Sequence, residues 1–138
     1  LIGIEVCAAI KNFYSMIIGS ANELNTAAFL LNKSIIEMKK FVKFLGGSEK
    51  SVYGLAGLGD LYVSSAGGRN SKMGQLLGKG HLYTEAKAKF MLNETIEGAE
   101  LAMDIGKKVL KDFSQKDLPL MHALIDAICN NKKFTIKW

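Results

Sequence analysis

The sequence predicts an all-α fold. It contains a single proline and six methionines in 138 residues, and proline is the residue that helix interiors tolerate least, whereas methionine is a good helix former. Apolar residues recur at three- and four-residue steps, and the apolar stretches at Tyr62-Val63 and residues 134–138 are too short to build a sheet. With 49% hydrophobic residues, the chain has the size and composition of one domain with its own core.

The first predicted helix, from Ile4 to about Ser20, is hydrophobic nearly all round, so we expect it at the centre of the domain. The second, over residues 27–45, carries an apolar stripe opposite its lysines, and the glycine pair that follows is typical of a helix end. A short helix is predicted over residues 48–53. Capping residues and apolar spacing place the remaining helices, which begin at Asp60, after Asn70, at Thr84 (with its hydroxyl as cap), near Glu97 and at Pro119.

Charge and composition exclude several functional classes. The net charge of +5 comes from lysines scattered along the chain, whereas a nucleic-acid binding surface would cluster them on one face. Cys7 and Cys129 sit in apolar surroundings, so each is predicted to be a small buried hydrophobe. His81 and His122 have no further ligand at metal-binding spacing, and no metal site is predicted.

The apolar run at the N-terminus is predicted to be a buried helix of a soluble protein. Glu5, Lys11 and Asn12 interrupt it, and a bilayer centre would penalise these side chains, so we expect no membrane span. We expect a cytoplasmic location because neither cysteine is predicted to form a disulfide. Because the chain opens on Leu1 inside this run, we expect it to be a piece of a longer protein. No linker or repeat divides it.

The most informative segment is Gly54–Asn70, which contains five glycines, one carboxylate and an Arg-Asn pair. Glycine amides that lead into a helix can direct several donors at one phosphate, and Arg69 would add a planar, permanently charged group. The alternative is that these glycines only make turns between short helices. The segment is no dinucleotide-binding fingerprint, because no β-strand precedes it.

Lys11 is the second unusual feature, because an ammonium group in an apolar helix needs a partner or a function to offset its desolvation. Facing a polar cavity, it would serve as a general acid or base; the alternative is a lysine that reaches past the apolar surface to water. Asp60 is the expected partner, with helix capping as its other role, and Ser64 lies one turn beyond on the same side. Glu97 is a carboxylate at a helix start, where the dipole favours it.

Three segments in this order, Glu5–Asn12, Gly54–Asp60 and Gly67–Asn70, resemble the C-terminal half of NAD(P)-dependent glycerol-3-phosphate dehydrogenases. In that family an N-terminal Rossmann domain holds the nicotinamide cofactor, and an all-helical C-terminal domain completes the substrate pocket. The resemblance implies that residues 1–138 are a single substrate-binding domain of the 6-phosphogluconate dehydrogenase C-terminal-like type. It also implies a homodimer, and a chain that is inactive alone because the Rossmann domain is absent from it.

By this resemblance, Lys11 is the proton donor or acceptor at the carbon-2 oxygen as hydride moves between the cofactor, NAD or NADP, and dihydroxyacetone phosphate. Asp60 is implied beside it as a second catalytic residue. The implied substrate contacts are Lys11, Asn12, Asp60, Ser64, Gly68, Arg69 and Asn70, and the implied cofactor contacts are Arg69, Thr95 and Glu97. Thr95 and Glu97 follow neither the eukaryotic nor the bacterial form fully, which leaves the choice of NADH or NADPH open.

Two other functions fit the residues. One is a non-catalytic helical binding or dimerisation module, because the 138 residues hold no cofactor-binding half. The other is the helical domain of a related hydroxyacid or ketoacid reductase, which a carboxylated substrate in place of a phosphorylated one would distinguish.

Overall fold

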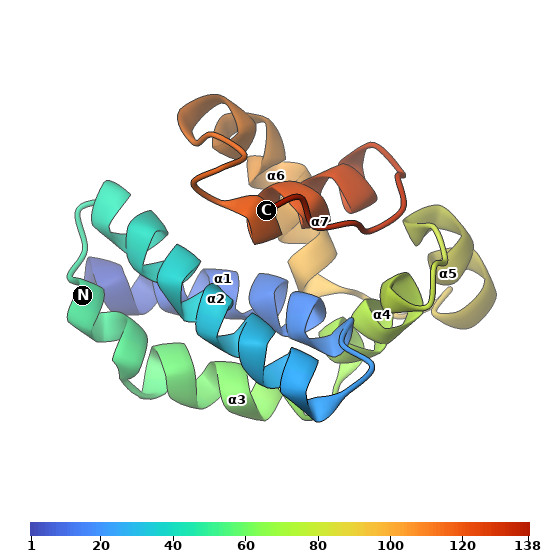
Figure 1. Ribbon diagram of the computed structural model, residues 1–138, viewed down its shortest axis with the longest axis horizontal. Helices are drawn as coiled ribbons and strands as arrows, with labels where there is room; N and C mark the ends of the chain where they lie inside the picture. Colours follow the sequence, from blue (N-terminus) through green and yellow to red (C-terminus); the bar gives the residue numbers. More distant parts are fainter.

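The computed structural model describes every residue from 1 to 138. Helix α1 (Ile2–Gly19) runs through the centre of the molecule (Figure 1). It packs against α2, α3, α4, α6 and α7, and its Cys7, Phe13 and Tyr14 side chains are fully buried. By length and composition α1 would suffice to cross a membrane. About half of its residues are buried and contribute to the hydrophobic core, whereas Ile2 and Ile4 near its start are about half exposed, so its central position is confirmed but its burial is not complete.

The other elements surround α1 and contain no strand, which confirms the all-α prediction. Figure 1 shows α2 alongside α1, α3 below them, α6 and α7 above, and α4 and α5 at one end. In chain order these are α2 (Leu24–Phe44), the 3₁₀-helix η1 (Glu49–Tyr53), the π-helix η2 (Leu55–Gly59), α3 (Asp60–Ser65), α4 (Arg69–Gly78), α5 (Tyr83–Phe90), α6 (Glu97–Asp112) and α7 (Pro119–Cys129).

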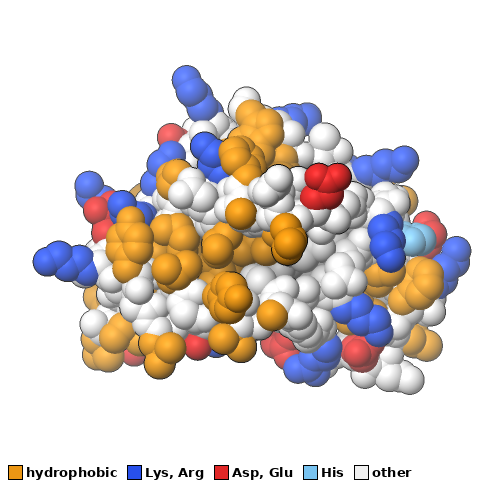
Figure 2. All heavy atoms as spheres, turned by 60° about the horizontal axis from the view of Figure 1, so that its bottom comes forward, with side chains coloured by type: hydrophobic (Ala, Val, Ile, Leu, Met, Phe, Trp, Pro, Cys, Tyr) orange, Lys and Arg blue, Asp and Glu red, His pale blue; other side chains and the backbone are white.

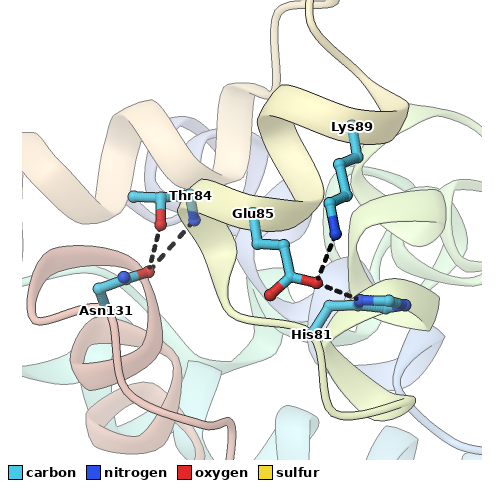
Figure 3. Close-up of polar contacts among 5 residues, drawn as sticks. All are labelled: His81, Thr84, Glu85, Lys89 and Asn131. Carbon is cyan, nitrogen blue, oxygen red and sulfur yellow. Dashed lines mark hydrogen bonds and ion pairs between the residues drawn. The ribbon is translucent and has the colours of Figure 1, made fainter.

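Two predictions about single residues were wrong. The Thr84 hydroxyl does not cap α5; instead, the Asn131 carboxamide oxygen accepts from the Thr84 amide at 3.2 Å and from its hydroxyl at 3.1 Å (Figure 3). The cap therefore comes from the segment after α7. Cys129 is exposed at the end of α7, although Ile128 beside it is buried.

Figure 3 also shows Glu85 of α5 between His81 and Lys89. Its carboxylate lies 3.3 Å from His81 Nδ1 and 3.4 Å from Lys89 Nζ. The hydrogen bond from His81, followed by that from Lys89, holds the pKa of Glu85 below its ordinary value. These contacts link α5 to the segment that precedes it.

Helix α4 approaches α1 unusually closely, and glycines permit it. A Cβ added at Gly74 would lie 2.0 Å from the Met16 carbonyl oxygen, and one at Gly78 would lie 2.3 Å from the Ser20 carbonyl oxygen. No side chain fits at these positions, so the two backbones are in direct contact. This contact determines where the N-terminus of α4 lies relative to the middle of α1.

Glu37 is a buried carboxylate that the sequence did not single out. It is 3% exposed on α2 and accepts from the Tyr14 hydroxyl at 2.9 Å and from the Leu120 and Met121 amides at 2.6 and 3.1 Å. The two amides belong to the first turn of α7, where no helical partner is available. Glu37 therefore caps α7 from a distance and joins it to α1 and α2.

We expect Gly74→Ala to destabilise the protein by about 1–3 kcal/mol or more, because the new methyl group forces α4 away from a backbone atom that cannot move aside. Thermal or denaturant unfolding measures the change. Gly67→Ala is the matched control, since a Cβ there meets nothing within 4 Å. Equal stability of the two variants would contradict the close approach.

The pH dependence of stability is expected to report on Glu37. Burial raises its pKa from 4.5 to about 7, against the opposing effect of its hydrogen bonds and of Lys40. The folded state thus binds a proton that the unfolded state releases, so stability falls as pH rises from about 4.5 to about 7, by up to about 3 kcal/mol. Glu37→Gln should flatten this fall in thermal unfolding curves recorded across that interval. A fall of the same size in the variant would show that another group causes it.

Candidate active site

Lys11 and Asp60 form an ion pair, with 2.8 Å between Lys11 Nζ and Asp60 Oδ2. Lys11 projects from the middle of α1 with 24% of its side chain exposed, and Asp60 is the first residue of α3 with 38% exposed. The structure thus brings together the two residues that the sequence analysis paired. Asp60 makes no capping hydrogen bond to α3, so that alternative was wrong.

The π-helix η2 delivers Asp60 to this position. It leads directly into α3, and both elements pack against α1. Gly57 of η2 is buried, and a Cβ there would lie 2.2 Å from the Val52 carbonyl oxygen. Part of the glycine-rich segment therefore serves packing, which places the carboxylate beside Lys11.

Gly68 precedes α4 and Arg69 is its first residue. The N-terminus of α4 lies beside the same hollow as Lys11. Gly68 has φ +96°, a backbone conformation that favours glycine, and its carbonyl accepts the first helical hydrogen bond, from the Lys72 amide at 3.0 Å. The amides of Arg69, Asn70 and Ser71 precede that bond and have no partner within the helix. With the helix dipole, such free amides favour an anion.

Glu97, the first residue of α6, connects the start of α6 to the start of α4. Its Oε1 accepts from Arg69 Nη2 and its Oε2 accepts from Asn70 Nδ2 at 3.2 Å. The Gly98 amide donates to Asn70 Oδ1 at 2.8 Å, and Asn70 is only 8% exposed. Both ends of the Asn70 carboxamide are therefore held in one orientation.

These side chains enclose a polar hollow of about 330 Å³ without a single hydrophobic residue in its lining. The lining residues are Lys11, Asn12, Ser64, Gly67, Gly68, Arg69, Asn70 and Glu97. Asp60 is not part of this lining, but it contacts Lys11, which is. Asp60 lines a second hollow together with Ile4 and Leu55. Lys11 and Arg69 each have a carboxylate partner, so the charged side chains balance.

Two predicted site residues do not line this hollow: Asp60, which contacts Lys11 from beside it, and Thr95. Thr95 is exposed just before α6 and lines a separate hollow of about 260 Å³ with Asn93, Glu94 and Glu100.

The sequence analysis assigned no contact to Gly67, which lines the polar hollow, or to Gly98, whose amide holds Asn70 in place. A Cβ at Gly98 would lie 2.8 Å from both the Asn12 carbonyl oxygen and Asn70 Oδ1. In the sequence, the only sign of this close packing is that Gly98 follows a carboxylate at a helix start. No group of three His, Cys, Asp or Glu residues is placed to hold a metal ion.

Comparison with known proteins supports the resemblance on which part of the sequence analysis depended. Residues 1–136 match the family described as NAD-dependent glycerol-3-phosphate dehydrogenase C-terminus. A glycerol-3-phosphate dehydrogenase [NAD(P)+] of Phytoplasma australiense is 35% identical over 142 residues, which cover 99% of this chain and 42% of that protein.

Solved structures share the fold. The glycerol-3-phosphate dehydrogenase of Coxiella burnetii superimposes with a TM-score of 0.80 at 26% identity, covering 96% of this chain and 42% of that one. The yeast enzyme, from Saccharomyces cerevisiae, superimposes with a TM-score of 0.81 at 24% identity, covering 97% of this chain and 40% of that one, and supports the fold alone. The chain thus spans about two fifths of the length of these proteins. It belongs to the family of NAD-dependent glycerol-3-phosphate dehydrogenase C-terminal regions.

Proposed function

We propose that this chain is the substrate domain of an oxidoreductase that interconverts sn-glycerol 3-phosphate and dihydroxyacetone phosphate. The observation that carries the proposal is the polar hollow, where the Lys11–Asp60 pair and the N-terminus of α4 lie together. One end of the hollow offers a proton-transfer group, and the other offers donors for a phosphate. A substrate with an alcohol or carbonyl carbon and a phosphate at one end matches both.

Lys11 is proposed to give or take the proton at the carbon-2 oxygen. Its ammonium donates a hydrogen bond to the ketone oxygen and stabilises the negative charge that develops there during reduction. In the oxidation direction, the neutral amine takes the hydroxyl proton. Asp60 fixes the direction of Nζ through the 2.8 Å contact, and Asn12 and Ser64 lie in the same lining to bind the hydroxyl groups of the substrate.

Arg69, Gly68 and Asn70 are proposed to hold the phosphate. The free amides at the start of α4 and the Arg69 guanidinium supply charged and neutral donors to the phosphate oxygens. The phosphate is remote from carbon 2, so its binding energy serves to position the substrate against Lys11. Substitution of a residue that contacts the phosphate should therefore change KM for the substrate more than it changes the rate of the chemical step.

A nicotinamide, NAD or NADP, would supply or accept the hydride at carbon 2. Among this chain's residues, Arg69, Thr95 and Glu97 are proposed to contact it; Arg69 and Glu97 are half-exposed at the hollow and Thr95 is exposed nearby. These residues offer donors and acceptors without an enclosed cavity. We therefore propose that a Rossmann domain holds most of the cofactor.

The surface around Asp60 supports the proposal of a covering domain. Figure 2 shows the face that carries α3, with a broad band of hydrophobic side chains. Ile4, Leu55, Tyr62 and Val63 are all exposed by about half or more, and the hollow of about 410 Å³ beside Asp60 is lined in part by Ile4 and Leu55. Such a contiguous apolar surface is typical of one that another domain or subunit covers.

The homodimer and the cytoplasmic location stay predictions.

We expect Lys11→Ala in the full-length enzyme to lower kcat by roughly 10²–10⁴-fold, because a positioned general acid contributes that much. Steady-state kinetics with dihydroxyacetone phosphate measures the loss, and cofactor binding should change little. Lys43→Ala is a suitable control, since Lys43 is an exposed lysine on α2. Normal turnover without Lys11 would remove the catalytic assignment.

We expect Arg69→Ala in the full-length enzyme to raise KM for dihydroxyacetone phosphate by roughly 10-fold or more, because a charge-assisted hydrogen bond to the phosphate is lost. Lys72→Ala, one turn further along α4 and paired with Glu94, should leave KM unchanged. Carboxylated hydroxyacids and ketoacids should be poor substrates. An unaltered KM, or a preference for carboxylated substrates, would favour a related reductase.

A further inference from the structure

Glu97 binds the two side chains to which the proposed function assigns the phosphate. One carboxylate oxygen accepts from Arg69 and the other accepts from Asn70 Nδ2 at 3.2 Å. A phosphate oxygen that binds these donors must share them with a carboxylate already present. Two anions within hydrogen-bonding distance of the same donors repel each other.

Asn70 has little freedom to avoid Glu97. Asn70 cannot turn its carboxamide over, because the Gly98 amide donates to its Oδ1 at 2.8 Å. Gly98 is itself closely packed, since a Cβ there would lie 2.8 Å from both the Asn12 carbonyl oxygen and Asn70 Oδ1. The Asn70 Nδ2 group is therefore held towards Glu97, and Arg69 is the more exposed partner, with half of its side chain in solvent.

The other charges of the hollow do not compensate for this carboxylate. Lys11 is paired with Asp60, and Arg69 is paired with Glu97, so the four charged side chains sum to zero. A ligand with two negative charges would meet a neutral set of side chains together with the amides at the start of α4. The outer pair of Lys72 and Glu94 lies outside the lining.

We propose that Glu97 is a specificity-determining residue that acts as an internal anion and competes with the substrate phosphate for Arg69 and Asn70. This inference rests on the proposed phosphate role of α4. Glu97 keeps the two donors in position and lowers the affinity for a phosphate ester, most strongly for its doubly charged form. Loss of the charge at residue 97 therefore tightens phosphate binding.

The test is equilibrium binding of glycerol 3-phosphate to the full-length protein without cofactor, by calorimetry. For Glu97→Gln, which retains the shape and one acceptor, we expect Kd to fall by about three- to tenfold at pH about 8, where a phosphate ester carries close to two charges. The gain should be smaller at pH about 5.5, where the ester carries roughly one. A purely structural role for Glu97 would not produce this pH difference.

Two further variants separate charge from contact. Glu97→Asp retains the charge and should not tighten binding, and Glu94→Gln, which removes a carboxylate outside the hollow, should leave Kd unchanged. Unchanged or weaker binding by Glu97→Gln overturns the inference. If Arg69→Ala weakens binding in that case, the phosphate site stands without the role of Glu97. If the unsubstituted protein does not bind glycerol 3-phosphate, both proposals fail.

Discussion

The direct backbone contact between α1 and α4 is the constraint on which the rest of the structure depends. Gly74 and Gly78 have no room for a Cβ against the Met16 and Ser20 carbonyl oxygens, so α4 packs backbone against backbone on the last turns of α1 and the residue after it. Lys11 lies in the preceding part of α1, and Arg69 begins α4. Because close-packed helices do not slide continuously past each other, this contact holds Lys11 and the N-terminus of α4 at a constant separation.

Pairing of charges is the second organising feature of the site. Lys11 with Asp60 and Arg69 with Glu97 are both partly exposed pairs, which contribute little to stability. Their value lies in orientation, because each cation is directed by a carboxylate from another element, α3 in one case and α6 in the other. The buried carboxylate of Glu37 has a structural role instead, because it accepts from two amides of α7 and so joins α7 to α2.

Local patterns were sufficient to predict the α-helices, the short helix η1, the glycine end of α2 and the pairing of Lys11 with Asp60, but not the π-helix η2 within the glycine-rich segment. A lysine in a mostly apolar helix needs a partner for its ammonium group, and Asp60 is the only carboxylate in the glycine-rich segment. Patterns failed where a distant residue decides the outcome. Asn131 caps α5 from beyond α7, and Glu37 caps α7 from α2, and neither partner has a signature at the helix that it caps.

The same limit applies to Glu97 and Thr95. The sequence placed Glu97 correctly at a helix start, but its bonds to Arg69 and Asn70 depend on how α6 meets α4. Thr95 stands two residues earlier and lines a different hollow, because the chain turns into α6 between them. Spacing along the sequence does not reveal on which side of such a turn a side chain lies.

A crystal structure of the full-length protein with glycerol 3-phosphate tests the central claim most directly. The account predicts that the phosphate lies at the N-terminus of α4, within hydrogen-bonding distance of Arg69 and the amides after Gly68. It also predicts that the carbon-2 oxygen lies within about 3 Å of Lys11 Nζ. A phosphate bound elsewhere, or a carbon-2 oxygen out of reach of Lys11, would contradict the account.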